Sequence, residues 1–332
     1  MEKRTLGRTG LQVSMLGFGC GAVGGLMVRG NPADQERAVA RALEAGVNYF
    51  DTAVQYGDGA SERTLGRVLK NLRPSDAIVG TKVRVPPAAS GDLNAIIRRS
   101  LEGSLQRLGL ESVDIFYLHN PITLEGSDDT LSARRVLEEV VPAFTQLRQQ
   151  GKIRFLGLTA IGQTRALHDV IDARAFDVAQ VPYNLLNSSA GGGLPQGYPG
   201  QDYDGILNHT QAAGVGVVGI RVLAGGALSG SAERHPVASP PPAPIGSAPT
   251  YEADLARAGE LSPLVTDGLA SSLSEAATRF AISHSAIATI LVGMATIHEF
   301  EQALAAVKRG PLPPAGLARV AELQQTFVGK AP

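Results

Sequence analysis

The feature that most constrains the fold is an alternation of short apolar runs with amphipathic helical segments, repeated eight times along 332 residues. In one such unit the apolar run 77–82 is followed by the segment 93–108, where large apolar residues recur every three or four positions. Strands that alternate with helices pair in parallel, and eight such units are typical of a closed (β/α)8 barrel. The sequence therefore predicts an α/β fold of the TIM-barrel type.

The predicted strands of this barrel are residues 15–19, 47–51, 77–82, 113–119, 153–159, 178–183, 215–222 and 288–292. The predicted helices are 34–45, 62–72, 93–108, 132–150, 163–173, 203–213, 274–283 and 297–308, with Ser61 as the N-cap of the second. An N-terminal β-hairpin over 3–14 and an extra C-terminal helix over 317–327 flank the barrel. The connections 187–202 and 225–273 are expected to be long lids or binding loops, with simple disorder over 231–250 as the alternative. No break in composition divides the chain, so residues 1–332 are expected to form a single domain.

Bulk properties narrow the function classes. The net charge of −1 gives no electrostatic reason to expect nucleic-acid or membrane-surface partners. The chain has no apolar run of roughly 18 residues and no apolar signal segment near Met1, so no membrane association is expected. The single cysteine, Cys20, excludes an internal disulfide and metal sites built on several thiolates, and it fits a cytoplasmic location. No metal site is predicted.

Polar residues stand at the ends of three neighbouring predicted strands: Asp51, Lys82 and His119. Taken alone, each residue has an ordinary structural explanation: Lys82 as a surface lysine, His119 as a core histidine and Asp51 as a helix or turn cap. In such a barrel, however, the carboxyl ends of the strands meet at one face, which is where chemistry occurs. A carboxylate, an ammonium group and an imidazole at equivalent strand ends are hard to explain by packing, so we expect them to form a site.

A tyrosine completes this set. Tyr56 lies five residues after Asp51 in a glycine-rich loop. A phenol has a reference pKa of about 10, and a nearby ammonium group such as that of Lys82 is expected to lower the pKa of Tyr56 toward working pH. Asp51 could hold Lys82 in an ion pair, and His119 could hydrogen-bond a substrate oxygen. These groups would transfer a proton at a carbonyl or alcohol oxygen.

The set offers no nucleophile with an adjacent base, so a hydride carrier would have to be bound from outside. A barrel isomerase that uses the Lys82–Tyr56 pair without a cofactor is the remaining alternative. An open, doubly wound sheet would need a glycine fingerprint after the first strand, which residues 17–22 match only loosely.

The motifs resemble those of the aldo-keto reductases in order and spacing, and the resemblance spans nearly the whole chain. They are Asp51-Thr52-Ala53-x-x-Tyr56-Gly57-x-Gly59-x-Ser61-Glu62, Gly80-Thr81-Lys82, Asp114-x-x-x-x-His119 and Gln180-x-x-Tyr183-Asn184. The resemblance implies an oxidoreductase that interconverts a small-molecule carbonyl (aldehyde, ketone or sugar) and an alcohol with NAD(P)(H). Its catalytic tetrad would be Asp51, Tyr56, Lys82 and His119, with Tyr56 as general acid/base. A nucleotide-sensing regulatory subunit of the same fold, with little turnover, is the alternative.

The resemblance also implies a dinucleotide site. Its expected residues are Gly21, Ala22, Asp51, Thr159, Gln180, Tyr183, Arg221, Leu223, Gly225, Gly293, Thr296 and Glu299. Thr159 and Gln180 would hold the nicotinamide carboxamide, because Ala160 replaces the amide usual in the family. The stretch 221–225 would contact the pyrophosphate. The alternative for Arg221 is an ion pair with a barrel carboxylate.

Thr296 and Glu299 would lie at the adenosine end, where the family usually has basic residues. NADP(H) is favoured by the resemblance to the family. NAD(H) is the alternative, because Glu299 would repel a 2′-phosphate. Neither the specific substrate nor the reaction direction nor the oligomeric state can be predicted from the sequence.

Overall fold

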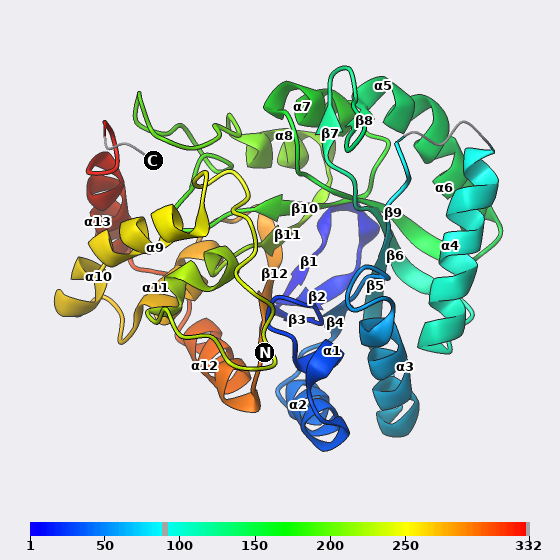
Figure 1. Cartoon of the computed structure of the whole chain (residues 1–332), viewed down its shortest axis with the longest axis horizontal. Coiled ribbons are helices and arrows are strands. Elements are labelled where there is room, and N and C mark those ends of the chain that lie inside the picture. The colour runs from blue at the N-terminus through cyan, green and yellow to red at the C-terminus, as the bar shows by residue number, and fades with distance from the viewer. Residues whose placement is uncertain (88–91, 330–332) are drawn as a thin grey trace.

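In the computed structural model, which describes residues 1–87 and 92–329, eight parallel strands form a closed barrel (Figure 1). The strands are β3 (Leu16–Gly19), β4 (Tyr49–Asp51), β5 (Ile78–Val83), β6 (Val113–Leu118), β9 (Ile153–Thr159), β10 (Val178–Pro182), β11 (Gly216–Ile220) and β12 (Ile287–Gly293). They pair in chain order, and β12 pairs with β3 to close the ring. The predicted fold class is confirmed, whereas a single domain over 1–332 stays a prediction.

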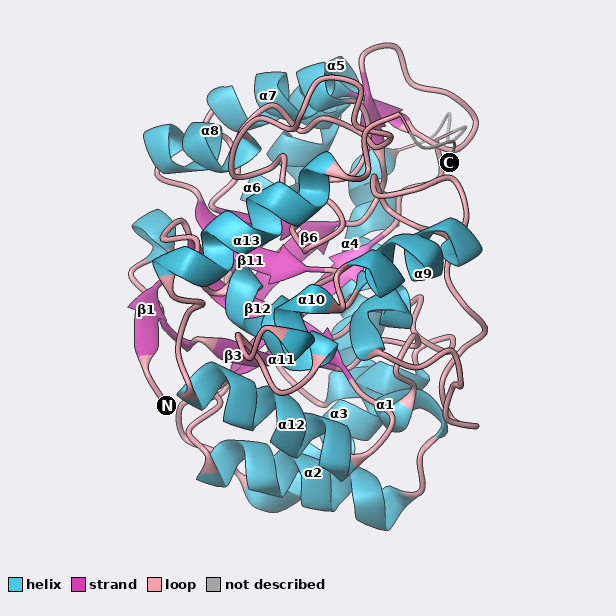
Figure 2. Ribbon diagram, turned by 90° about the vertical axis from the view of Figure 1, so that its left-hand side faces the viewer, coloured by secondary structure: helices cyan, strands magenta, loops and turns pink. Residues whose placement is uncertain are grey.

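Helices surround the barrel, as the side view in Figure 2 shows. They are α2 (Pro32–Glu44), α3 (Ala60–Leu72), α4 (Leu93–Leu108), α7 (Thr164–Asp172), α8 (Ile206–Ala213), α11 (Leu273–Ala281), α12 (Ile297–Lys308) and the added α13 (Pro314–Gln325). The predicted helix 132–150 consists of α5 (Ala133–Arg135), the π-helical segment η2 (Val136–Val140) and α6 (Val141–Gln149). Within the described residues, no helix is both long and apolar enough to cross a membrane.

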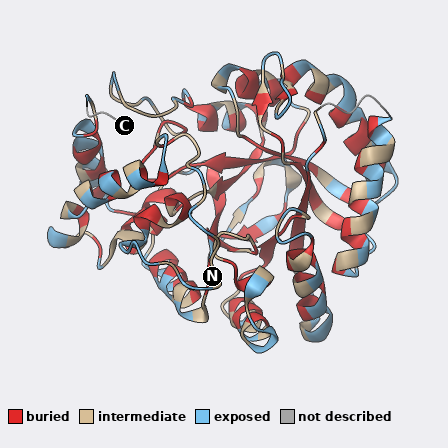
Figure 3. Ribbon diagram, viewed as in Figure 1, coloured by how far each residue is buried: buried red, intermediate tan, exposed pale blue. Residues whose placement is uncertain are grey.

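The predicted N-terminal hairpin consists of β1 (Lys3–Thr5) and β2 (Gln12–Ser14), joined by the 3-10 turn η1 (Gly7–Thr9). Its apolar residues Leu6 and Val13 are fully buried and pack in one cluster with Ile115 and Val218 of the barrel strands. The hairpin therefore closes the amino-terminal end of the barrel. A larger apolar cluster lies between the strands and the helices, and the barrel strands are mostly buried in Figure 3.

The connection 225–273 is more regular than expected. It contains η3 (Ala224–Ser229), α9 (Tyr251–Glu260) and α10 (Pro263–Thr266). Helix α9 begins where the Thr250 side chain accepts a hydrogen bond from the Ala253 amide, as an N-cap does. The prediction of a continuous loop was wrong here, because the proline-rich run at 236–244 ends before Thr250, where the helix begins. Short elements α1 (Leu26–Arg29), β7 (Ile122–Thr123) and β8 (Leu131–Ser132) were also not predicted.

The predicted N-cap of α3 was also wrong. The helix begins at Ala60, after Gly59 in the left-handed conformation, and Ser61 lies inside it. The buried Ser61 hydroxyl donates to the Cys20 carbonyl (2.8 Å) and lies 2.8 Å from the Thr52 hydroxyl. Ser61 therefore joins the loops that follow β3 and β4, both of which border the cavity described below.

Candidate active site

Side-chain alternation along the strands directs the predicted polar residues into the barrel. Tyr49 and Ile78 belong to the interior cluster at the starts of β4 and β5. Successive side chains of a strand point to opposite faces, so residues two and four positions later share the interior face. Asp51 and Lys82 are these residues. Both are buried, with Lys82 fully inaccessible to solvent (0%).

The four predicted catalytic side chains come together at the carboxyl end of the barrel. The Lys82 ammonium donates to Asp51 Oδ1 (2.5 Å), to the Thr52 carbonyl (2.8 Å) and to Tyr56 Oη (3.2 Å). The His119 ring packs edge-on against the Tyr56 ring, with 6.1 Å between the ring centroids. A carboxylate, an ammonium group and a phenol therefore form one chain of hydrogen bonds, with an imidazole beside the phenol.

Both burial and the neighbouring charges determine the pKa values of these hydrogen-bonded groups. Burial lowers the pKa of Lys82, but the interactions with Asp51 and Tyr56 more than offset this effect. The pKa of Lys82 therefore lies above its ordinary value. Burial raises the pKa of Tyr56, and Lys82 opposes that rise without reversing it. The expected net lowering of the Tyr56 pKa was therefore wrong, although the effect of Lys82 has the expected direction. Tyr56 is a neutral phenol at neutral pH, which suits it to donate a proton.

His119 is held neutral. Burial lowers the pKa of His119 to about 3, and the positive charges of Lys82 and Arg84 act in the same direction. Its Nδ1 lies 3.3 Å from Gln55 Oε1. A neutral imidazole can hydrogen-bond a substrate oxygen without adding charge to the site.

A buried polar layer beneath the site was not predicted from the sequence. Gln180 Nε2 donates to the second oxygen of Asp51 (2.5 Å), and the hydroxyls of Tyr49 and Tyr117 lie 2.8 Å apart. Glycine makes room for these rings: a Cβ at Gly157 would lie 2.3 Å from the Tyr117 ring. Both oxygens of Asp51 are thus engaged, which fixes the carboxylate that holds Lys82.

The pair Thr81 and Glu62 has a structural role next to Lys82. Glu62 is fully buried and accepts from the Thr81 hydroxyl (2.6 Å) and from Arg107 Nε (2.6 Å). Because Thr81 precedes Lys82 on β5 and points the other way, this contact anchors the strand that carries the lysine.

A cavity of about 1170 Å³ extends from Tyr56 and His119 along β11 and β12 to the start of α12. Eleven of the twelve expected dinucleotide residues line it: Gly21, Ala22, Asp51, Thr159, Gln180, Arg221, Leu223, Gly225, Gly293, Thr296 and Glu299. Within the described residues the buried Thr159 hydroxyl has no hydrogen-bond partner, although it faces this cavity. Such a group calls for a polar partner on a ligand.

Tyr183 is the exception. Its ring stacks on Phe280, with 4.9 Å between the centroids, and lies edge-on to His284. It is not among the described residues that line the cavity. The expectation of a dinucleotide contact from Tyr183 is therefore not supported, because the ring packs behind the barrel wall. Its neighbour Asn184 has a structural role, donating to the Arg221 carbonyl (3.0 Å).

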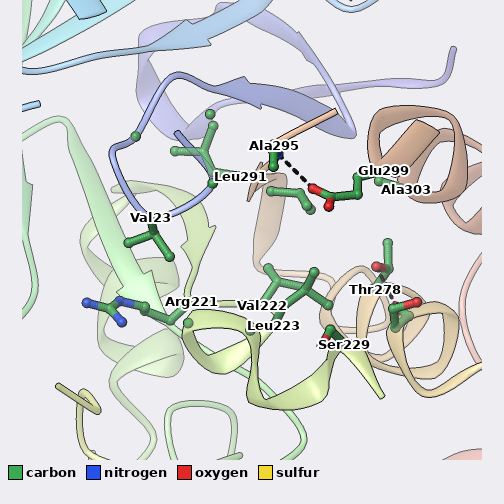
Figure 4. Close-up of a pocket in the computed structure, with 18 of the residues that line it drawn as sticks. Val23, Arg221, Val222, Leu223, Ser229, Thr278, Leu291, Ala295, Glu299 and Ala303 are labelled. Atoms are coloured by element: carbon green, nitrogen blue, oxygen red, sulfur yellow. Dashed lines mark hydrogen bonds between the residues drawn. The ribbon is translucent and has the colours of Figure 1, made fainter. Parts of the chain in front are cut away.

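At the far end of the cavity, two helix N-termini carry their own acidic caps. The Thr296 hydroxyl accepts from the Glu299 amide (3.2 Å), and Glu299 accepts from the Ala295 amide (2.7 Å; Figure 4). This arrangement resembles a capping box at the start of α12, with the carboxylate bound to the amide of Ala295, the residue before the N-cap. At the start of α11, Glu275 accepts two hydrogen bonds from Arg309 Nη1, each of 2.7 Å. Arg309, a cationic side chain that lines the cavity, is thus already paired.

The geometry supports proton transfer beside a bound organic ligand. A phenol supported by an ammonium group opens onto a cavity long enough for an extended molecule, and a neutral imidazole stands beside it. This chemistry suits a reaction at a carbonyl or alcohol oxygen.

Comparisons with known proteins agree with this geometry. The sequence model of the Aldo/keto reductase family matches residues 15–325. The chain is 31% identical to an L-galactose dehydrogenase of Arabidopsis thaliana over 92% of its own length and 88% of that protein. It is 27% identical to a pyridoxal 4-dehydrogenase of Microbacterium luteolum over 91% of each chain. The holo form of an aldo-keto reductase from Bacillus halodurans superposes with a TM-score of 0.71 at 25% identity, covering 100% of this chain and 97% of that one.

Proposed function

The chain belongs to the aldo/keto reductase family, and from this premise we propose that it interconverts a carbonyl compound and an alcohol by hydride transfer with a nicotinamide dinucleotide, Tyr56 serving as general acid/base. The observation that carries the proposal is the hydrogen-bonded chain from Asp51 through Lys82 to Tyr56, which ends at the cavity. In reduction, Tyr56 donates its proton to the carbonyl oxygen. Lys82 then stabilises the phenolate that remains, because its charge lies 3.2 Å away.

The residues present fit a nicotinamide dinucleotide. The cavity volume of about 1170 Å³ exceeds the roughly 300–1,000 Å³ of ordinary ligand pockets, which leaves room for a dinucleotide and a small substrate. The unpartnered Thr159 hydroxyl and the Gln180 amide would hold the carboxamide. When bound, the nicotinamide supplies or accepts the hydride. His119, as a neutral imidazole, orients the substrate oxygen toward Tyr56.

For the dinucleotide we favour NAD(H) over the NADP(H) that the family resemblance suggests. A helix N-terminus ordinarily attracts a phosphate. At α12 this position is taken by the Glu299 carboxylate, which caps the helix. Arg309, which lines the same end, is bound to Glu275. A 2′-phosphate there would be repelled by the Glu299 carboxylate, and Arg309 is not free to compensate because it is paired with Glu275. A 2′-hydroxyl would not be repelled.

The proposal is tested by comparing wild type with Tyr56→Phe in a spectrophotometric assay of NADH and NADPH with a panel of aldehydes, ketones and alcohols. We expect the variant to lose about 100- to 10,000-fold in kcat while its dinucleotide Kd, measured by calorimetry, stays within about threefold. Tyr198→Phe is the matched control, because that hydroxyl bonds the Leu186 carbonyl outside the cavity lining. Equal turnover in wild type and Tyr56→Phe would contradict the mechanism and favour a nucleotide-binding regulatory role.

A further inference from the structure

Arg221 stands where the strand β11 opens into the cavity. It lines the same space as Tyr56 and His119. Its backbone has φ of 57°, in the left-handed region that a residue with a side chain rarely adopts. The Arg221 carbonyl accepts from the Asn184 side chain (3.0 Å) and from the Ala224 amide (2.8 Å), which holds this conformation. The fold therefore maintains a strained arginine at the site, and such strain often accompanies function.

The guanidinium of Arg221 has few partners. One long hydrogen bond joins it to the Ala243 carbonyl (3.5 Å). Among the described residues no carboxylate forms an ion pair with it, so the expected alternative of a barrel carboxylate partner is not found. Arg234 of the same cavity is different, because it donates to Gly225 (2.8 Å), Ser239 (2.9 Å) and Tyr251 (3.3 Å). A half-buried cation with donors to spare calls for an anion.

The charge of Arg221 acts at the Tyr56 end of the cavity. It lowers the pKa values of Tyr56 and Tyr203 against the larger opposing effect of burial, and it also interacts with Asp254. In Figure 4 the Arg221 side chain extends away from Glu299, with Val222 and Leu223 between them. The guanidinium is thus directed away from the adenosine end of the cavity.

We propose that Arg221 binds an anionic group of the substrate, a carboxylate or a phosphate, while the carbonyl oxygen of that substrate meets Tyr56. The inference rests on the proposed function and narrows it to aldehydes and ketones that carry a negative charge. A guanidinium forms two parallel hydrogen bonds with such a group, which fixes orientation as well as charge. The strained backbone keeps those donors within reach of the reacting end.

The test compares two matched pairs of substrates: 4-carboxybenzaldehyde with benzaldehyde, and glyceraldehyde 3-phosphate with glyceraldehyde. Wild type should favour the anionic member of at least one pair by about tenfold or more in kcat/KM. Arg221→Met should abolish that preference, and Arg221→Lys should restore part of it. Arg73→Met is the matched control, because Arg73 is also left-handed (φ 48°) and is an exposed helix C-cap outside the cavity lining.

Binding gives a readout that does not depend on turnover. In the presence of dinucleotide, calorimetry should show tighter binding of benzoate than of benzamide in wild type and no difference in Arg221→Met. That result in an enzyme without turnover on the whole panel of aldehydes, ketones and alcohols would contradict the proposed function and leave anion binding by Arg221 standing. If Arg221→Met instead weakens NAD⁺ binding about tenfold and leaves both discriminations unchanged, the anion is the cofactor pyrophosphate and the inference is overturned.

Discussion

The Lys82 ammonium lies 3.2 Å from the Tyr56 hydroxyl and 4.8 Å from the centre of its ring. We predict that Lys82→Met raises the pKa of Tyr56 further, because the Lys82 charge is the main influence that lowers this pKa against the effect of burial. Alcohol oxidation requires the phenolate, so below this pKa its rate should rise about tenfold per pH unit. The oxidation profile of the variant should therefore move to higher pH. Carbonyl reduction requires the phenol and should stay flat between about pH 6 and pH 9 in wild type.

The control for this prediction must separate charge from folding. Lys82→Met leaves the Asp51 carboxylate buried without its ion-pair partner, which costs about 3–5 kcal/mol of unfolding free energy. Asp51→Asn combined with Lys82→Met removes both charges and should recover part of that loss in denaturant unfolding. An oxidation profile that stays in place in both variants would show that Lys82 does not act on Tyr56.

His119 should not contribute an ionisation to the pH dependence of kcat/KM near neutral pH. Its pKa, lowered to about 3 by burial and then by Lys82 and Arg84, keeps the ring neutral throughout the working range. We expect kcat/KM for reduction to show no ionisation between about pH 5 and pH 8. His119→Asn should lower the level of that profile about 10- to 100-fold without changing its shape. An ionisation near neutrality that His119→Asn removes would contradict this prediction.

Gly157 is expected to tolerate no side chain. A Cβ there would lie 2.3 Å from the Tyr117 ring, which is fully buried. Gly157→Ala should therefore lower the unfolding free energy by about 1–3 kcal/mol. Gly259→Ala is the matched control, because nothing lies within 4 Å of a Cβ there and Gly259 is inside α9. The control should stabilise the protein by about 0.5–1 kcal/mol in the same denaturant titration.

The barrel and the catalytic cluster could be predicted because their signals are local. Each strand–helix unit shows its own periodicity, and residues such as Asp51 and Lys82 stand at the ends of apolar runs. Closure of the barrel then brings equivalent strand ends together, as the structure shows for the Lys82–Asp51 ion pair. The helix bounds of α4 and α12 agree with the predicted ones for a local reason too, because the side chains of Asp92 and Thr296 cap their first turns.

What the sequence could not predict depends on distant residues meeting or on the depth of burial. The Gln180–Asp51 hydrogen bond joins residues 129 positions apart, and no motif links them. The net rise of the Tyr56 pKa reflects burial, whereas the sequence indicated only the cation nearby. Ser61 precedes a helical run as an N-cap would, yet Gly59 already supplies the turn and leaves the serine hydroxyl to Cys20.

Glu299 should decide between the two dinucleotides. Its carboxylate caps α12 at the cavity end opposite Tyr56, so it opposes a 2′-phosphate. Wild type should bind NAD⁺ more tightly than NADP⁺ in calorimetry. Glu299→Gln keeps an oxygen for the Ala295 amide and removes the charge, so NADP⁺ should bind about tenfold more tightly and NAD⁺ within about threefold of wild type.

The matched control for that substitution is Glu301→Gln on the same helix. Glu301 pairs with Arg41 (2.5 Å) and is not among the described residues that line the cavity. Glu301→Gln removes the same charge from α12, about one helical turn or less from Glu299. Any general electrostatic effect should therefore appear in both variants. A ratio of NADP⁺ to NAD⁺ affinity that changes equally in both, or a wild type that already prefers NADP⁺, would show that the Glu299 carboxylate does not face the 2′ position of the ribose.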